Sequence, residues 1–425
     1  MTTPTGAVWQ DLERRGLLAV STPADALQGE LAAGPVALYC GFDPTGASLH
    51  VGHLTQVLTL RRFQRHGHRP FALVGGATGL IGDPRPTSER TLNSAEQVAE
   101  WVGRIRDQLT PFLEFDGPAA ATMVDNLDWL GGMSALELLR DIGKHFRVGK
   151  MLAKEAVSAR LASEHGISYT EFSYQLLQAA DFLELNRRHG VRLQTGGSDQ
   201  WGNLTAGVDL LHRVERQAVH AIGTPLVTKA DGTKFGKSEG GAIWLDPEMT
   251  SPYAFHQFWL NSDDRDVMSY VRYFTDLDLD EEEQLALDLR ERPHLRAPQR
   301  RLASELTSLV HGQQVRDAVE AAARALFGGE DLHGVDERTL VDAAAELPSA
   351  ELPIGASVVD ALTATGLSPS RSAARRSIGE GAVSVGGAKV TSEDAVLTLD
   401  DFVHGRVALL RRGRKTLAAV RPPSV

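Results

Sequence analysis

The chain of 425 residues is poor in cysteine and in long apolar runs. Its one cysteine, Cys40, can form neither an internal disulfide nor, by itself, a thiolate zinc site. No run of about 18 apolar residues is present, so we expect no contact with a membrane. The first residues, MTTPTGAVWQDLERRG, have the pattern of neither a secretory signal nor a transit peptide. These absences predict a cytoplasmic globular protein, and the length predicts two or three folding units.

Positive charge is scarce over most of the chain but not near its carboxyl end. The net charge is −11, which by itself disfavours a nucleic-acid partner. From Glu351 onward, however, ten Lys and Arg stand against seven Asp and Glu, which leaves −14 on the rest of the chain. A small basic module on an acidic body is typical of a local phosphate-binding surface. Charge alone is equally compatible with a basic face that is only solvated.

Strand and helix patterns alternate over the first half of the chain. Short β-rich runs at 36–40, 70–74 and 122–124 are separated by long amphipathic patterns at 49–66 and 94–115. This alternation predicts an α/β fold with a doubly wound, Rossmann-like parallel sheet. Sheets of this kind bind ligands at the carboxyl ends of their strands.

The strand signals stop after the first 250 residues. Charged helical patterns then continue to about residue 326, a stretch rich in turn residues follows, and the basic region comes last. We therefore expect four segments: a catalytic domain over 1–250, a helical domain over 251–326, a linker over 327–353 and a small basic domain over 354–425.

Two histidines surround a glycine in the stretch YCGFDPTGASLHVGHL, residues 39–54. Ser48 is a plausible N-cap, so the histidines are expected to open a helix that follows a strand and a tight turn. Their spacing places His50 and His53 on one helix face, and Gly52 lets a ligand approach the backbone. A helix N-terminus at the end of a strand favours an anion, which predicts a phosphate site. Zinc ligation and a purely structural histidine pair are the competing hypotheses, although no third zinc ligand follows at helical spacing.

A second cluster, TKADGTKFGKSEG at 228–240, places three lysines among glycines and hydroxyl groups. A short cationic loop of this kind suits a mobile clamp on a polyphosphate. It is not a P-loop, because Asp231 occupies the position of a required glycine, and GGATGLIG is not a dinucleotide fingerprint, because Ala77 occupies its first glycine position. Taken by itself, KFGKS is also compatible with a charged surface loop.

Together, HVGH and KFGKS resemble the paired signature of class I aminoacyl-tRNA synthetases. GFDPTGASLHVGHL, GGATGLIGDP, VDNLDW, TEFSYQLLQAADF, GGSDQWGN and KFGKS also occur in the order and spacing of bacterial tyrosyl-tRNA synthetases. The segment SVVDALTATGLSPSRSAARRSIGEGAVSVGGAKV resembles a small α+β RNA-binding domain first described in a ribosomal protein. The resemblance thus covers nearly the whole chain.

This resemblance implies a two-step reaction. Tyrosine and ATP give tyrosyl-adenylate and pyrophosphate, and the tyrosyl group is then transferred to the 3′ adenosine of tRNA(Tyr). ATP enters as a substrate, Mg²⁺ accompanies the pyrophosphate, and neither a protein-bound metal nor a permanently bound cofactor is implied. A homodimer is expected from the family.

The resemblance also implies roles for individual residues. The positions that contact phosphates in the family's transition state are occupied here by Thr45, His50, Lys234 and Lys237. Other ATP-binding positions match Cys40, Gly41, Asp43, Gly52, His53, Asp199 and Ser238. Tyrosine-binding positions match Tyr39, Asp83, Asn126, Tyr174, Gln178, Asp181 and Gln200, with Asp181 accepting the phenolic proton. Contacts to tRNA phosphates are expected from Arg371, Arg375 and Arg376.

One motif departs from the family pattern. Family members commonly carry a lysine a few residues after GDP, whereas GDPRPTSER has Thr87 near that place. Arg85 is the available replacement, and Arg90 keeps the arginine that usually follows.

Two other classes of protein remain alternatives at this point. The first is an enzyme with the same histidine signature and a different substrate, either a tryptophan-specific synthetase or a small nucleotidyltransferase. Tyr39 with Asp181 favours a substrate that carries a hydroxyl group. The second is an RNA-binding protein that has lost catalysis, which the presence of Thr45, His50 and both loop lysines disfavours.

Overall fold

The computed structural model describes residues 5–85, 88–164, 166–230, 233, 235–238, 241–328, 331–413 and 416–423, without the side chains of residues 155, 156, 237 and 238. The contacts divide the chain into two compact units. Unit 1 comprises Met1–Asp246 and Asp263–Pro293, and unit 2 comprises Pro247–Ser262 and His294–Val425. In the described part of the chain, no helix has the length and apolar character needed to cross a membrane.

Unit 1 is built on a six-stranded sheet of order β1-β6-β5-β2-β3-β4. The strands are β1 (Val20–Ser21), β2 (Ala37–Phe42), β3 (Arg69–Val74), β4 (Thr122–Asp125), β5 (Val191–Gly197) and β6 (His220–Thr224). All neighbours pair in parallel except β1, which is antiparallel to β6. The predicted doubly wound α/β fold is confirmed. Chain order runs outward from β2 in one direction and from β5 in the other, so the topological switch point lies between these two strands.

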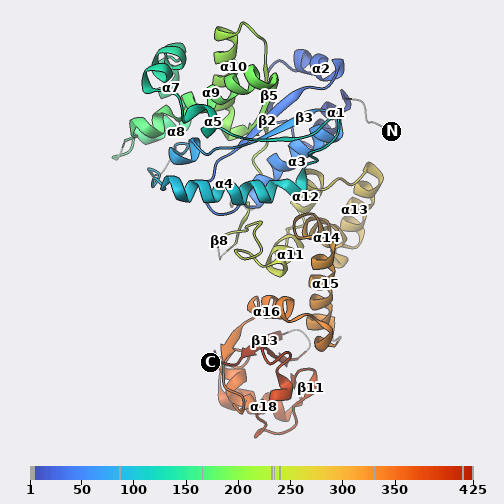
Figure 1. The fold of residues 1–425 in the computed structure, drawn as a ribbon. Coiled ribbons are helices and arrows are strands. Elements are labelled where there is room, and N and C mark those ends of the chain that lie inside the picture. The colour runs from blue at the N-terminus through green and yellow to red at the C-terminus, as the bar shows by residue number, and fades with distance from the viewer. Residues whose placement is uncertain are drawn as a thin grey trace. The chain divides into compact units, whose positions relative to one another are not determined.

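Helices cover both faces of this sheet (Figure 1). Helices α9 (Tyr169–His189) and α10 (Trp201–Val214) pack on one face, and α3 (Val51–Arg65) and α4 (Ala95–Leu109) lie against the other. The strands are largely buried, as parallel strands covered on two sides must be.

The remaining α-helices and strands of unit 1 are shorter or peripheral. They are α1 (Ala7–Arg14), α2 (Ala24–Ala33), α5 (Leu127–Leu130), α6 (Ala135–Glu137), α7 (Val148–Leu152), α8 (Glu155–Leu161), the hairpin β7 (Lys237–Ser238) and β8 (Gly241–Ala242), α12 (Val267–Phe274) and α13 (Leu279–Glu291).

Unit 2 combines helices with a second sheet. Its helices are α11 (Pro252–Leu260), α14 (Ala297–His311), α15 (Gln313–Gly328), α16 (Glu337–Ala345), α17 (Val358–Ala364) and α18 (Arg371–Gly379). Its strands are β9 (Ser349–Glu351), β10 (Val383–Val385), β11 (Ala388–Lys389), β12 (Ala408–Arg412) and β13 (Thr416–Arg421), in the order β11-β10-β12-β13-β9.

The second sheet is buried on both faces. Ala408, Leu410 and Ala418 pack with α17 and α18, whereas Leu409 and Leu417 pack with α15 and α16. The carboxyl-terminal strands therefore share a core with the helices that precede them.

These units divide the chain differently from the four expected segments. The segment expected as one helical domain contributes α12 and α13 to unit 1 and α11, α14 and α15 to unit 2. The stretch 327–353, expected as a linker, contains α16 and β9, and β9 pairs in parallel with β13. Its turn residues bound these short elements, which are held by contacts distant in sequence.

Candidate functional site

A pocket of about 390 Å³ opens at the switch point, between the carboxyl ends of β2 and β5. Most residues singled out from the sequence line it. They are Tyr39, Cys40, Gly41, Asp43, Thr45, Gly52, His53, Asp83, Tyr174, Gln178, Asp181, Asp199 and Gln200. The pocket therefore gathers segments separated by more than 150 residues, at the place where doubly wound sheets bind ligands.

His50 and His53 open α3, but the cap of the helix is not the expected one. The N-cap is His50, whose Nδ1 accepts the Gly52 N–H at 3.0 Å, while His53 Nδ1 accepts the His50 N–H at 3.1 Å. Ser48 instead donates its hydroxyl to the Leu49 carbonyl and to Gln108. The expected Ser48 cap was wrong because the backbone from Leu49 to Val51 pairs with residues 243–245, which delays the start of the helix.

These contacts fix where protons lie on the two imidazoles. Both Nδ1 atoms accept backbone N–H groups, so neutral rings carry their proton on Nε2. The rings stack with centroids 4.0 Å apart. Burial, with the adjacent His50, lowers the pKa of His53 to about 3, so His53 is neutral. A neutral imidazole that carries its proton on Nε2 can donate this N–H to an anion.

The HVGH and KFGKS motifs lie against each other. Val51 N–H donates to Ile243 O and Leu245 N–H donates to Leu49 O, both at 2.9 Å, directly after the β7–β8 hairpin. Gly236, at φ 77°, approaches so closely that a Cβ there would lie 2.8 Å from Val51 Cγ2 and 3.6 Å from Gly52 N. Lys234 lies outside the described residues, and of Lys237 and Ser238 only the backbone in β7 is described.

The deep end of the pocket holds a buried carboxyl group. Asp181 is 2% exposed and accepts hydrogen bonds from Asn126 Nδ2 at 3.0 Å and Trp129 Nε1 at 2.8 Å. Burial raises the pKa of Asp181 to about 8, against the lowering effect of these two donors. Asn126, which does not line the pocket, thus supports a residue that does.

Tyr39 lies in the same buried environment. Burial and the charge of Asp181 raise the pKa of the Tyr39 phenol. Among the described residues its hydroxyl has no hydrogen-bond partner. A buried polar group without a partner is costly, so this hydroxyl is suited to meet a polar group of a ligand.

Two further carboxyl groups line the same pocket, those of Asp43 and Asp83. Asp43 accepts the hydroxyls of Tyr174 and Thr78, both at 2.7 Å, and burial raises its pKa. Asp83 accepts from Gln200 at 3.1 Å and Asn203 at 3.2 Å, and burial raises its pKa as well. These two acids give the pocket a negative wall that is suited to a ligand ammonium group.

A buried ion pair holds the segment around GDPRPTSER. Arg160 Nη1 donates to Glu171 at 2.8 Å and to the carbonyls of Arg85 and Ser88, and Glu171 accepts the Arg90 N–H at 2.6 Å. Arg90 lines the pocket, whereas the Arg85 side chain is exposed. Thr87 lies outside the described residues.

Four site residues were missed by reasoning from the sequence. Trp129 and Thr78 hold pocket carboxyl groups, Asn203 holds Asp83, and Phe235 forms part of the pocket wall. All four stood inside motifs already quoted, and the aromatic residues Trp129 and Phe235 within such motifs were the available signal.

Cys40 contributes a neutral thiol. Burial raises its pKa to about 12, and the thiol lies 3.8 Å from both the Gly41 carbonyl and Gln56 Oε1. Across the described residues, no group of three or more His, Cys, Asp and Glu side chains is arranged to hold a metal ion.

The basic residues expected to contact RNA lie in unit 2. Arg371, Arg375 and Arg376 are exposed on α18. Arg371 pairs with Asp360, and Arg375 lies 3.7 Å from Glu393. Such exposed ion pairs contribute little stability, so the arginines can exchange partners readily.

Comparison with known proteins gives consistent matches. The family model described as class I tRNA synthetases (W and Y) matches residues 31–328, and a model of a tyrosine–tRNA ligase carboxyl-terminal domain matches residues 339–420. The tyrosine–tRNA ligase of Streptomyces coelicolor is 63% identical over 411 residues, which are 96% of this chain and 97% of that protein. That of Mycobacterium tuberculosis is 56% identical over 98% of this chain and 99% of its own. A truncated mitochondrial tyrosyl-tRNA synthetase from Aspergillus nidulans superposes with a TM-score of 0.68 at 30% identity, covering 75% of this chain and 94% of its own.

Proposed function

Because the chain belongs to the class I tRNA synthetases of the tryptophan and tyrosine family, we propose that it activates L-tyrosine with ATP and transfers the tyrosyl group to the 3′ end of tRNA(Tyr). The observation that carries the choice of substrate is that Asp181 lines the same pocket as the Tyr39 hydroxyl, which has no hydrogen-bond partner among the described residues. The Asp181 carboxylate can accept a hydrogen bond from the phenolic hydroxyl of tyrosine, while the Tyr39 hydroxyl donates to the oxygen of that phenol. Phenylalanine offers neither group, and its binding would leave both pocket groups unpaired.

The remaining polar groups fit the rest of the amino acid. Asp83, Tyr174 and Gln178 are assigned to the α-ammonium group, and Gln200 to the carboxylate. The hydrogen bonds from Gln200 and Asn203 to Asp83 support this assignment, because they hold the acid at the pocket wall before a ligand arrives.

ATP, as its magnesium complex, is assigned to the side of the pocket formed by α3 and β5. Cys40, Gly41, Gly52, His53 and Asp199 are assigned to its adenosine part. Asp43 and Ser238 are also assigned to ATP. The phosphates themselves are the preferred oxygen ligands of Mg²⁺, so no dedicated protein cage is needed.

Adenylate formation is an in-line displacement. A tyrosine carboxylate oxygen forms a bond to the α-phosphorus, the bond from that phosphorus to the bridging oxygen breaks, and pyrophosphate leaves with the bonding electrons. The residues contribute positioning and charge stabilisation. Thr45 and His50 donate to the departing phosphates, and Lys234 and Lys237 complete the clamp. The contact between Gly236 and the start of α3 supports this joint action.

Unit 2 is assigned to tRNA. The match of residues 339–420 to a tyrosine–tRNA ligase domain and the exposed arginines of α18 support phosphate contacts there. Helices α11, α14 and α15 are assigned to the anticodon side. We assign the protein to the cytoplasm, and its match to bacterial tyrosine–tRNA ligases supports this location.

A homodimer is also proposed. Seven large apolar side chains are exposed within one stretch of unit 1: Leu127, Leu136, Leu139, Val148, Leu152, Leu161 and Tyr169. Such a concentration of exposed apolar groups is typical of a protein interface.

The test is an exchange assay of purified protein with labelled pyrophosphate, ATP and each of the twenty amino acids in turn. Tyrosine alone should support rapid exchange, and tRNA(Tyr) should then accept the tyrosyl group. Exchange with tryptophan would replace this proposal by the tryptophan-specific alternative. Absence of exchange with every amino acid would leave the small nucleotidyltransferase and the RNA-binding protein as the alternatives.

A further inference from the structure

Phe235 connects the KFGKS segment to a helix outside the sheet. Its ring lines the pocket on one side. On the other side it lies 5.0 Å from the ring of Tyr270 and 5.6 Å from that of Phe274, nearly parallel to the latter at 13°. Both partners belong to α12, and both are buried.

Two polar contacts fasten the same segment to the same helix. The Tyr270 hydroxyl donates to the Thr228 carbonyl at 3.3 Å, and the Ala230 N–H donates to Asp266 Oδ2 at 2.9 Å. Helix α12 thus holds the described part of residues 228–235 at both ends of the segment. Gly236 follows directly and packs on the start of α3.

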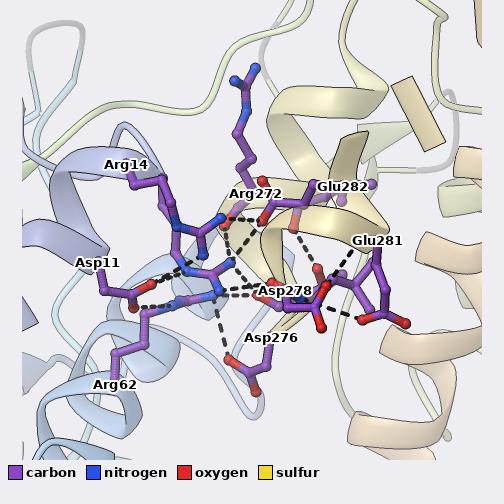
Figure 2. Close-up of polar contacts among 12 residues, drawn as sticks. Asp11, Arg14, Arg62, Arg272, Asp276, Asp278, Glu281 and Glu282 are labelled. Carbon is purple, nitrogen blue, oxygen red and sulfur yellow. Dashed lines mark hydrogen bonds and ion pairs between the residues drawn. The ribbon is translucent and has the colours of Figure 1, made fainter. Parts of the chain in front are cut away.

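Two buried arginines hold α12 in turn. Figure 2 shows the polar cluster around Arg62, between Asp11 and the segment 272–282. Arg15 donates to the carbonyls of Arg272, Thr275 and Leu277, and Arg62 Nη2 donates to the Thr275 carbonyl at 2.8 Å. Carbonyls at a helix C-terminus lack helical partners and carry partial negative charge, so guanidinium groups are favourable there.

These arginines are unusually deep for cationic side chains. Arg15 is 5% exposed and Arg62 is 3% exposed. Burial, with the charge of Arg15, lowers the pKa of Arg62 to about 10. Asp11 lies 2.8 Å from Arg15 and 3.9 Å from Arg62, and Asp276 lies 3.8 Å from Arg62. A buried charged cluster is a poor source of stability compared with apolar packing, which points to a role in fixing one geometry.

We propose that α12 positions the KFGKS segment through Phe235, which is the positioning residue that packs on this helix. Arg15 and Arg62 in turn hold α12 in place. The inference rests on the proposed adenylate chemistry and adds residues that do not touch the reacting atoms. By packing on α12, Phe235 places Gly236 against the start of α3, next to the residues assigned to the phosphates.

The first experiment compares Phe235→Ala with Phe115→Ala, a substitution of an exposed phenylalanine that lies outside the pocket. In tyrosine-dependent pyrophosphate exchange, Phe235→Ala should lower kcat about 10- to 100-fold, as expected when reacting groups are misplaced. The KM for tyrosine should stay unchanged, because the Asp181 end of the pocket is intact. Phe235→Leu, which keeps most of the apolar volume, should recover part of the activity.

Limited trypsin digestion supplies a readout that does not depend on activity. Without its anchor, the segment should be cleaved faster after the lysines of 228–238 in Phe235→Ala than in Phe115→Ala. Equal cleavage and equal kcat in the two variants would overturn the proposal, as would a parallel rise in the KM for tyrosine. Absence of exchange in the unmodified protein would instead contradict the proposed function itself.

The role of the buried arginines is tested with Arg62→Lys, which keeps the charge and removes the planar guanidinium group. Arg65→Lys is the matched control, because Arg65 lies one turn further along α3 and also pairs with Asp276 but is exposed. Arg62→Lys should lower kcat without changing the KM for tyrosine, and Arg65→Lys should change neither. Identical kinetics in the two variants would exclude a role of Arg62 in positioning α12. Should Arg62→Lys fail to fold, Tyr270→Phe tests the role of α12 by removing the hydrogen bond to Thr228. Unchanged trypsin cleavage of that variant would contradict the proposal that α12 positions the segment.

Discussion

Trp129 donates its indole N–H to Asp181 Oδ1 over 2.8 Å, and this bond joins the short helix α5 to the middle of α9. Together with Asn126 it leaves Asp181 held from two sides before any ligand binds. The carboxyl group therefore does not have to reorganise to meet a substrate hydroxyl.

Replacing Asp181 should remove the preference for tyrosine over phenylalanine. Above about pH 8, where Asp181 is ionised, loss of a hydrogen bond to a charged group is worth about 1.5–3 kcal/mol, so the ratio of kcat/KM values for the two amino acids should fall by about 10- to 100-fold in Asp181→Ala. Asp128→Ala, at an exposed position of α5, is the control and should keep the ratio. An unchanged preference in Asp181→Ala would remove the assignment of this pocket.

The affinity for tyrosine should depend on pH through the same residue. Burial raises the pKa of Asp181 to about 8, so below that pH the empty pocket holds a carboxylic acid. Its protonated oxygen cannot accept a hydrogen bond from the phenolic hydroxyl of tyrosine. The dissociation constant for tyrosine should therefore fall as pH rises toward 8. Phenylalanine, which lacks the hydroxyl, should show only the weaker dependence that comes from Asp83, whose pKa is also raised, and the same is expected for tyrosine with Asp181→Asn. Tighter binding of tyrosine at low pH would reverse the assigned donor and acceptor.

The same shift affects folding in a defined direction. The folded pKa of Asp181 lies above the ordinary aspartate value of about 4, so the native state binds more protons than the unfolded state between about pH 4 and pH 8. In that window Asp181 makes the empty protein less stable as pH rises. Denaturant titrations should show a smaller decrease in stability between these limits for Asp181→Asn.

His50 has two roles that substitution can separate. It caps α3 through Nδ1, and it is assigned to the departing phosphates. His50→Ala should lower kcat for adenylate formation and also lower stability by about 1 kcal/mol, the usual contribution of an N-cap. His50→Asn keeps a good capping acceptor, so it should restore the melting temperature and leave kcat low. Recovery of kcat with His50→Asn would mean that the residue acts only as a cap.

Local patterns predicted the first sheet well, because each β-strand and the helix after it carry their own periodicity. The start of α3 was misplaced because Leu49–Val51 pair with a segment almost 200 residues away. The contact of Trp129 with Asp181 is likewise invisible in sequence, since it joins residues 52 positions apart. The double burial of β12 had a visible signal, since Ala408–Leu410 is a continuous apolar run rather than an alternating one.

That shared core decides how the role of unit 2 can be tested. Deleting residues 354–425 would expose Val319, Leu340 and their neighbours on α15 and α16, which pack against β12 and β13. The truncated chain should therefore lose stability as well as any RNA contact. Substitutions of exposed residues separate the two effects.

Neutralising α18 should weaken tRNA charging and spare amino acid activation. In the triple variant Arg371→Gln, Arg375→Gln and Arg376→Gln, pyrophosphate exchange should be unchanged, because α18 belongs to unit 2 and the pocket to unit 1. The kcat/KM for tRNA should fall, and the slope of log affinity against log salt should decrease by about 0.9 for each phosphate that the variant no longer neutralises. Arg406→Gln removes an exposed arginine of the same unit that pairs with Glu337, and it should change neither quantity. Full charging and an unchanged salt slope in the triple variant would assign the basic face of α18 to a purpose other than tRNA.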